Sequence, residues 1–131
     1  MAHAITPFLM FEGVAEDAMK FYVSLFTNSE INHIERYQSG EQGAEGSIKR
    51  ADFTVSGQKF ICIDSPIEHA FSFTPAMSIF VDCENEEELQ NAFQQLSSEG
   101  SILMPLDDYG FSKQFGWLND RFGVSWQLNL Q

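Results

Sequence analysis

ITPFLMFEGVAEDAMKFYVSLF, residues 5 to 26, changes its hydrophobic period part-way along. Residues 5 to 11 are apolar apart from Thr6, which predicts a β-strand. After Glu12 the apolar residues recur at i, i+3, i+4 and i+7, the spacing of one helix face. These positions are Ala18, Phe21, Tyr22 and Leu25. The stretch therefore predicts a strand followed directly by an amphipathic helix.

Three short strands are predicted after this helix, and the same order of elements then occurs again. The three strands cover residues 30–37, 47–56 and 59–65, with a polar, glycine-rich loop before the second. The second half begins with an apolar strand at 76–83 and an amphipathic helix at 85–100, with Asn85 as its N-cap. Its three further strands are predicted at 101–107, 112–119 and 123–130.

The order strand, helix, strand, strand, strand thus occurs twice, in halves of about 66 residues. We predict an α+β fold of two paired βαβββ modules, at about 1–66 and about 76–131, joined by a linker at 67–75. A chain of 131 residues is expected to form a single domain. Side by side, the modules would join their sheets into a curved, eight-stranded half-barrel with the helices on its outer face. Its concave side, the cup, would be the cavity.

The chain is strongly acidic, with 19 acidic and 7 basic residues and a formal net charge of -12. This charge repels nucleic acids and anionic lipid surfaces, so neither is an expected partner. Solubility is the simplest role for the charge, and attraction for a cationic ligand is the functional alternative. No segment reaches the ~18 apolar residues of a membrane span, and no secretory signal is recognisable. We therefore expect a cytoplasmic protein in which Cys62 and Cys83 stay reduced.

Two stretches resemble a known family: ITPFLMFEGVAEDAMKFYVSLFTNSEI at 5–31 and YGFSKQFGWLNDRFGVSWQL at 109–128. They are similar to the PhnB-like branch (demethylubiquinone methyltransferase-like domain) of the vicinal oxygen chelate superfamily, which includes glyoxalases, bleomycin resistance proteins and extradiol dioxygenases. The resemblance implies the paired-module fold, a homodimer, and either metal-dependent catalysis or sequestration of an antibiotic. Methyl transfer is not expected, because the chain has no glycine-rich βα turn of the nucleoside-binding type.

Enzymes of this superfamily, as the resemblance implies, mostly hold a divalent metal with His, Gln or Glu from the first and last strands of the two modules. The matching positions in this chain are Pro7 or Thr6, Cys62 or Asp64, Ala76, and Gln127. These offer at best one thiol, one carboxylate and one amide, whereas a stable divalent site needs three or more ligands of matched type. We therefore expect neither a metal nor another cofactor.

The last predicted strand alternates apolar and polar residues, so it has two chemically different faces. Val124, Trp126, Leu128 and Leu130 share the face that we expect against the helices. Ser125, Gln127 and Asn129 share the other, which lines the cup if the resemblance holds and is otherwise a solvated surface. By the same alternation, the candidate ligand-binding residues are Cys62, Asp64, Ser78, Phe80, Trp117, Ser125 and Gln127.

Some of these residues also have a purely structural interpretation. Cys62 has no nearby histidine or lysine to activate it, which favours an inert core thiol. Asp64 precedes Ser65 and Pro66 and could simply cap a turn, and Trp117 could belong to the core. The segment Asp120 to Gly123 is interpreted as a hairpin link in which Gly123 takes a positive φ.

The leading hypothesis is a small-molecule-binding protein of the glyoxalase and bleomycin-resistance superfamily without a catalytic metal. The expected ligand is a small, partly apolar organic molecule, and the acidic surface favours cationic ones. The alternative is a metal-dependent lyase, isomerase or dioxygenase of the same superfamily, with at least three ligands converging in the cup. An interaction domain without any ligand is a third possibility.

Overall fold

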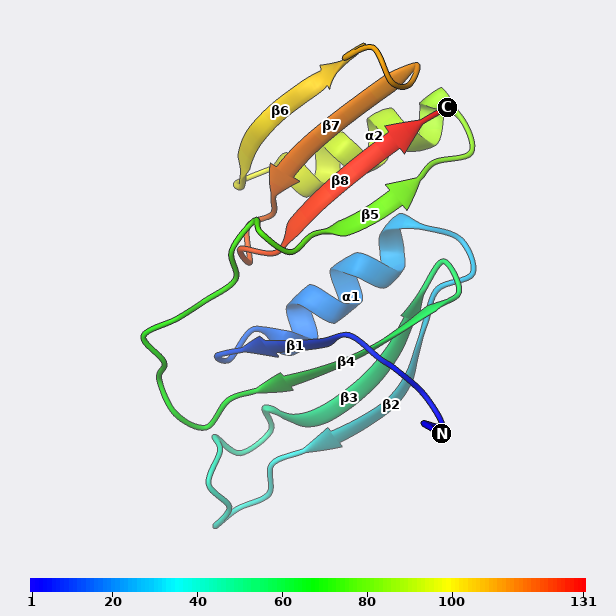
Figure 1. Cartoon of the computed structure of the whole chain (residues 1–131). Coiled ribbons are helices and arrows are strands. Elements are labelled where there is room, and N and C mark those ends of the chain that lie inside the picture. Colours follow the sequence, from blue (N-terminus) through cyan, green and yellow to red (C-terminus); the bar gives the residue numbers. More distant parts are fainter. The chain divides into compact units, whose positions relative to one another are not determined.

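The computed structural model describes all residues from 1 to 131, which form two compact units. The first unit is Met1–His69 and the second is Ala70–Gln131. Each unit consists of one four-stranded sheet and one helix (Figure 1). Neither helix has both the length and the apolar character needed to cross a membrane.

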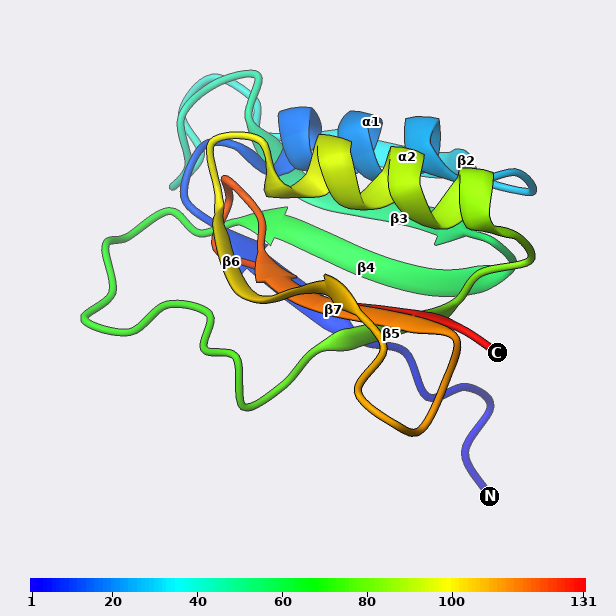
Figure 2. The same ribbon diagram turned by 90° about the horizontal axis from the view of Figure 1, so that it is seen from above.

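The first unit contains β1 (Phe8–Phe11), α1 (Ala15–Leu25), β2 (Glu30–Arg36), β3 (Ile48–Val55) and β4 (Gln58–Asp64). Its sheet has the strand order β1-β4-β3-β2, so the first strand of the unit lies beside the last. That pair is parallel, whereas β4 with β3 and β3 with β2 are antiparallel. α1 lies along one face of the sheet, mainly over β3 (Figure 2).

Aromatic packing between α1 and the sheet forms the core of the first unit. Tyr22 of α1 stacks on Phe53 of β3 with ring centroids 6.5 Å apart, and Phe53 stacks on Phe60 of β4 at 5.3 Å. All three side chains are buried. Removing one large apolar side chain from water contributes about 1.5–3 kcal/mol, so this stack is a main source of the unit's stability.

α1 begins without a capping side chain of its own, because Val14 occupies the N-cap position. Asp64, at the end of β4, takes over this role. Its Oδ1 accepts hydrogen bonds from the N–H groups of Gly13 (2.8 Å) and Ala15 (2.9 Å), and its Oδ2 accepts one from the N–H of Ile48 (2.9 Å). The carboxylate therefore joins the first turn of α1 to β3 and β4, where the positive end of the helix dipole favours a negative charge.

A bidentate ion pair connects α1 to β2. Both Nη atoms of Arg36 donate to the carboxylate of Glu16, at 2.8 and 2.7 Å. The hydrogen bonds from Arg36 lower the pKa of Glu16 to about 2. Because both side chains remain partly exposed, solvent screens the pair, and it contributes little to stability.

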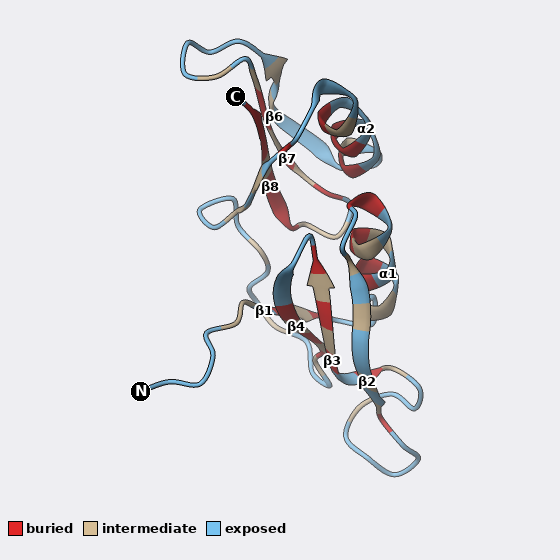
Figure 3. Ribbon diagram, turned by 90° about the vertical axis from the view of Figure 1, so that its right-hand side faces the viewer, coloured by how far each residue is buried: buried red, intermediate tan, exposed pale blue.

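The second unit contains β5 (Ile79–Asp82), α2 (Glu86–Ser97), β6 (Ser101–Asp107), β7 (Gln114–Asn119) and β8 (Ser125–Leu130). Its strand order, β5-β8-β7-β6, repeats that of the first unit, and its parallel pair again joins the first strand to the last. β8 is buried along most of its length, whereas β2 and β6, at the ends of their sheets, are mostly exposed (Figure 3).

α2 has the helix start that the sequence predicts. The side chain of Asn85 accepts a hydrogen bond from the N–H of Glu88 at 2.8 Å. The buried face of the helix packs on β7 and β8, and Phe93 comes closest at Gly116. A Cβ at Gly116 would overlap the Phe93 ring, so this position requires glycine for close contact between helix and sheet.

The hairpin between β7 and β8 is organised by Asp120. Its Oδ1 accepts from the N–H groups of Phe122 (2.8 Å) and Val124 (3.0 Å), and its Oδ2 accepts from Nε1–H of Trp126 (2.9 Å). Gly123 has a φ of 92°, as predicted for this turn. The structural interpretation of this segment and the placement of Trp126 in the core are both confirmed.

The predicted α+β fold of two βαβββ modules is confirmed, and each helix covers one face of its own sheet. All ten predicted elements are present, with bounds within a few residues of the predicted ones. The strands hydrogen-bond in two separate sheets of four, and neither forms a closed barrel. The joining of the two sheets into one half-barrel stays a prediction.

Candidate functional site

The second sheet has one face on the side away from α2, on which Phe80 is exposed while Phe115, Ser125 and Asn129 are buried. Leu128 of β8 lies opposite Gly116 of β7, which touches the Phe93 ring of α2, so Leu128 faces the helix. The intervening residues Gln127 and Asn129 therefore point to the opposite side. The alternation predicted for the last strand is confirmed. We call this side the open face. Its residues are Ser78, Phe80 and Asp82 from β5 and the residue before it, Ser125, Gln127 and Asn129 from β8, and Phe115, Trp117 and Asn119 from β7.

One end of the open face is held by a short chain of hydrogen bonds. Nε1–H of Trp117 donates to Oγ of Ser125 at 2.8 Å, and Oγ of Ser125 lies 2.7 Å from Oγ of Ser78. Ser125 is buried. The structure thus brings together three of the predicted site residues, and the two serines fix the orientation of the Trp117 indole.

The middle of the open face places an amide between two aromatic residues. Gln127 is paired with Phe80 on one neighbouring strand and with Trp117 on the other. Phe80 is 53% exposed, whereas Gln127 and Trp117 are half-buried. The Gln127 side chain forms no hydrogen bond within the chain. Its amide can therefore both donate to and accept from a bound molecule.

The other end of the open face contains polar residues that the sequence analysis did not select. Nδ2 of Asn129 donates to Oδ1 of Asp82 at 2.9 Å. Because a carboxylate only accepts, this bond fixes the orientation of the amide and leaves Oδ1 of Asn129 as a buried acceptor without a partner. The rings of Phe80 and Phe115 lie 6.4 Å apart beside it. The alternation along β5 could have indicated Asp82, which is two residues from Phe80.

The prediction that Cys62 and Asp64 line the ligand site is wrong. These residues of β4 face α1: Phe60 is paired with Phe53 and Cys62 with Ala51, on the helix side of β3. Asp64 is bound by three backbone N–H groups and is 3% exposed. The physical reason is that the uncapped start of α1 needs an acceptor from the sheet.

The Cys62 thiol has the properties of an inert core residue. Burial, together with the charge of Asp64, raises its pKa to about 12. Burial raises the pKa of Cys83 to about 12 as well. Both thiols are free of disulfide bonds and stay protonated at neutral pH, so neither is a ready nucleophile or metal ligand.

The chain does not offer the ligand set of a divalent metal enzyme of this superfamily. Thr6, Pro7 and Ala76 stand where the first strands would supply ligands, and none of them has a suitable donor group. Asp64 has the only carboxylate at a position that matches a metal ligand of the superfamily. That carboxylate already accepts three hydrogen bonds from backbone N–H groups. Nowhere do three or more His, Cys, Asp or Glu side chains come together in a metal-binding group.

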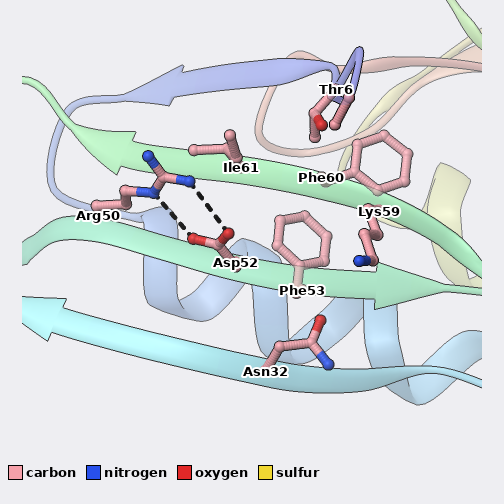
Figure 4. Close-up of a pocket in the computed structure, with 9 residues that line it drawn as sticks. Thr6, Asn32, Arg50, Asp52, Phe53, Lys59, Phe60 and Ile61 are labelled. Atoms are coloured by element: carbon pink, nitrogen blue, oxygen red, sulfur yellow. Dashed lines mark hydrogen bonds and ion pairs between the residues drawn. The ribbon is translucent and has the colours of Figure 1, made fainter. Parts of the chain in front are cut away.

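The first unit has a hollow of about 380 Å³ on the face of its sheet away from α1. Figure 4 shows the residues that line it: Arg50 and Asp52 from β3, Lys59 and Ile61 from β4, Asn32 from β2, and Thr6 from the segment before β1, together with Phe53 and Phe60, whose rings pack toward α1. We call it the Lys59 pocket. Its volume lies in the range of small-molecule sites.

Comparison with known proteins agrees with this fold and its duplicated modules. The model of the 3-demethylubiquinone-9 3-methyltransferase family matches residues 3–129. The chain belongs to this family. Among its relatives is the PhnB protein of Bacillus cereus, which is 58% identical, with a TM-score of 0.96 over 98% of this chain and 100% of that one. The resemblance to PhnB-like proteins is therefore confirmed, whereas membership of the vicinal oxygen chelate superfamily stays a prediction.

More distant similarities extend over the whole chain. Protein PA1353 of Pseudomonas aeruginosa is 24% identical, with a TM-score of 0.86 over 99% of this chain and 98% of that one. Protein YjdN of Escherichia coli is 24% identical and aligns with 96% of this chain over 94% of its own length. The fosfomycin resistance protein FosX of Listeria monocytogenes is 9% identical over 100% of this chain and 94% of that one, with a TM-score of 0.62, and shares the fold alone.

Proposed function

We propose that the chain is a small-molecule-binding protein that holds a partly apolar organic ligand on the open face of the second sheet. The observation that carries the proposal is Gln127, whose amide lies between Phe80 and Trp117 without a hydrogen bond of its own. Small-molecule sites typically combine apolar or aromatic walls with a few unsatisfied polar groups. A ligand here could bind the amide while its apolar part covers the rings.

A cationic ligand fits this face best. Aromatic rings attract cations to their faces, and Asp82 adds a carboxylate to the same side of the sheet. The net charge of -12 also draws cations toward the protein from a distance. Binding should therefore weaken as salt is added.

Binding without a resident metal is part of the proposal, because Thr6, Pro7 and Ala76 offer no suitable ligands. A homodimer and a cytoplasmic location also stay predictions. If the protein is a homodimer and the site is shared between its subunits, the ligand would also contact the open face of the second copy.

Titration of the ¹⁵N-labelled full chain with benzylammonium, whose N–H groups can donate to the amide oxygen of Gln127, tests the proposal. We expect saturable NMR shifts at Phe80, Gln127 and the indole N–H of Trp117. The indole N–H of Trp126 donates to Asp120 on the other side of the sheet and should not move. Gln127→Ala should weaken binding about fivefold, the equivalent of about 1 kcal/mol for one hydrogen bond.

The matched control is Gln90→Ala on the exposed face of α2, which should leave the affinity unchanged. NMR shifts that map to another surface, or an affinity that Gln127→Ala leaves unchanged, would overturn the proposal. Stoichiometric retention of manganese, iron, nickel or zinc after desalting, lost in Gln127→Ala, would instead support a metal-dependent enzyme.

A further inference from the structure

One end of the open face is a row of paired residues that crosses all four strands of the second sheet. Asn129 of β8 is paired with Asp82 of β5 on one side and with Phe115 of β7 on the other. Phe115 is paired in turn with Asp107 of β6. Residues paired across neighbouring strands point to the same side of a sheet, so all four side chains lie on the side of the open face. The row therefore has a carboxylate at each end.

This end of the sheet is acidic. Asp82, Asp107 and, in the loop after β6, Asp108 are all exposed. The second unit has two basic residues: Lys113 lies just before β7 at this end, and Arg121 lies in the hairpin at the opposite end. Three carboxylates thus outnumber one lysine here, and their excess charge favours a bound cation.

Two amide oxygens on β8 have no hydrogen-bond partner within the chain. One belongs to Gln127, and the other is Oδ1 of Asn129, a residue that is 3% exposed. Because Nδ2 of Asn129 donates to Asp82, Oδ1 lies on the other edge of the amide and turns away from that carboxylate. The two amides are two residues apart on one face of a strand, which separates them by about 7 Å. A buried acceptor of this kind costs free energy until a donor reaches it.

Aromatic rings from the loop between β6 and β7 cover this row. The loop projects from the sheet on the side away from α2 (Figure 2). The rings of Tyr109 and Phe111 lie 6.1 and 5.1 Å from the ring of Phe115, which is buried, whereas Phe111 is 60% exposed. Because Asn129 lies beside Phe115 in the row, movement of these exposed rings opens a path to its Oδ1. Their faces would then attract a cation bound there.

We propose that the ligand of the open face is a diamine whose two ammonium groups lie about 7 Å apart. One ammonium donates to the amide oxygen of Gln127, and the other donates to Oδ1 of Asn129 in the acidic row. The hydrocarbon between them packs on Phe80 and Phe115, which are paired with these two amides and have ring centroids 6.4 Å apart. This inference rests on the function proposed above and adds the second charge of the ligand.

NMR titrations of the ¹⁵N-labelled full chain at constant ionic strength test the proposal with two compounds. Meta-xylylenediamine carries two ammonium groups at neutral pH, and meta-methylbenzylamine has the same shape with only one. We expect both compounds to shift the side-chain amide signal of Gln127. Only the diamine should shift the side-chain amide signal of Asn129 and the backbone signals of Tyr109 and Phe111. The diamine should also bind at least about fivefold more tightly, because its second ammonium forms charge-assisted hydrogen bonds.

Asp82→Asn tests the acidic row directly. The change removes one charge but keeps an oxygen that can accept from Nδ2 of Asn129. It should weaken binding of the diamine about threefold more than binding of meta-methylbenzylamine. Glu87→Gln is the matched control, since it removes the same charge from an exposed position of α2, on the other side of the sheet. It should leave the affinity ratio of the two compounds unchanged.

Three results would each refute the diamine: equal affinities for the two compounds, an unchanged Asn129 signal, or equal effects of Asp82→Asn and Glu87→Gln on the affinity ratio. If meta-methylbenzylamine still binds at Gln127 in these cases, the function proposed for the open face stands without the second ammonium site. If neither compound shifts the Gln127 signal, both proposals are wrong.

Discussion

At the scale of single residues, one buried carboxylate in each unit stabilises the fold by accepting hydrogen bonds. Asp64 accepts three backbone hydrogen bonds and replaces the missing cap of α1. Asp120 accepts three hydrogen bonds and holds the last hairpin together. Sequence patterns do not distinguish such carboxylates from catalytic ones, because burial and bonding partners depend on elements distant in the chain. Asp64 and Gly13 are 51 residues apart.

Replacement of Asp64 by asparagine should destabilise the first unit by about 2–3 kcal/mol. The amide would direct an N–H group at one of the backbone donors and would remove the charge that favours the start of α1. Urea denaturation followed by circular dichroism measures this change. Asp17→Asn is the control, since Asp17 is exposed in the same helical turn and should cost less than about 0.5 kcal/mol. Equal effects of the two changes would show that Asp64 is not a special cap.

At the scale of elements, periodicity predicted both helices and all eight strands, and the last strand also had its two faces assigned correctly. β8 alternates strictly between apolar and polar residues, so only one orientation buries its apolar side. β4 is different: Phe60 and Cys62 alternate with Ile61 and Ile63, and both sets are apolar. Its orientation was therefore open from sequence alone, which is why Cys62 and Asp64 were placed on the wrong side.

Close packing of α2 on β7 gives a prediction at this scale. Gly116→Ala should destabilise the second unit by about 1–3 kcal/mol, because the added methyl group would overlap the Phe93 ring. Phe93→Leu removes the nearest ring atoms and should offset part of this loss. The double variant should then be more stable than the summed effects of the single changes indicate, a coupling that thermal or urea denaturation measures. Strict additivity would mean that the ring is not what excludes a side chain at residue 116.

At the scale of the whole molecule, the dominant property is the net charge of -12, which destabilises the folded chain by self-repulsion. We expect added salt to stabilise the protein on the order of 1 kcal/mol as the Debye length falls from about 30 Å to about 8 Å. Glu45 and Glu68 are exposed, and replacing both with lysine would reduce the net charge to about -8, since each change adds two positive units. The variant should depend less on salt in differential scanning calorimetry. An unchanged salt dependence would contradict this explanation.

The strand order shared by the two sheets has a consequence for how the chain is made. In each unit the first strand to leave the ribosome pairs with the last one: β1 with β4, and β5 with β8. Neither β1 nor β5 has any other partner in its sheet, so each must wait, unpaired, until about fifty more residues have been synthesised. Because the pattern is duplicated, the first sheet can close once Asp64 has emerged, before most of the second has been translated.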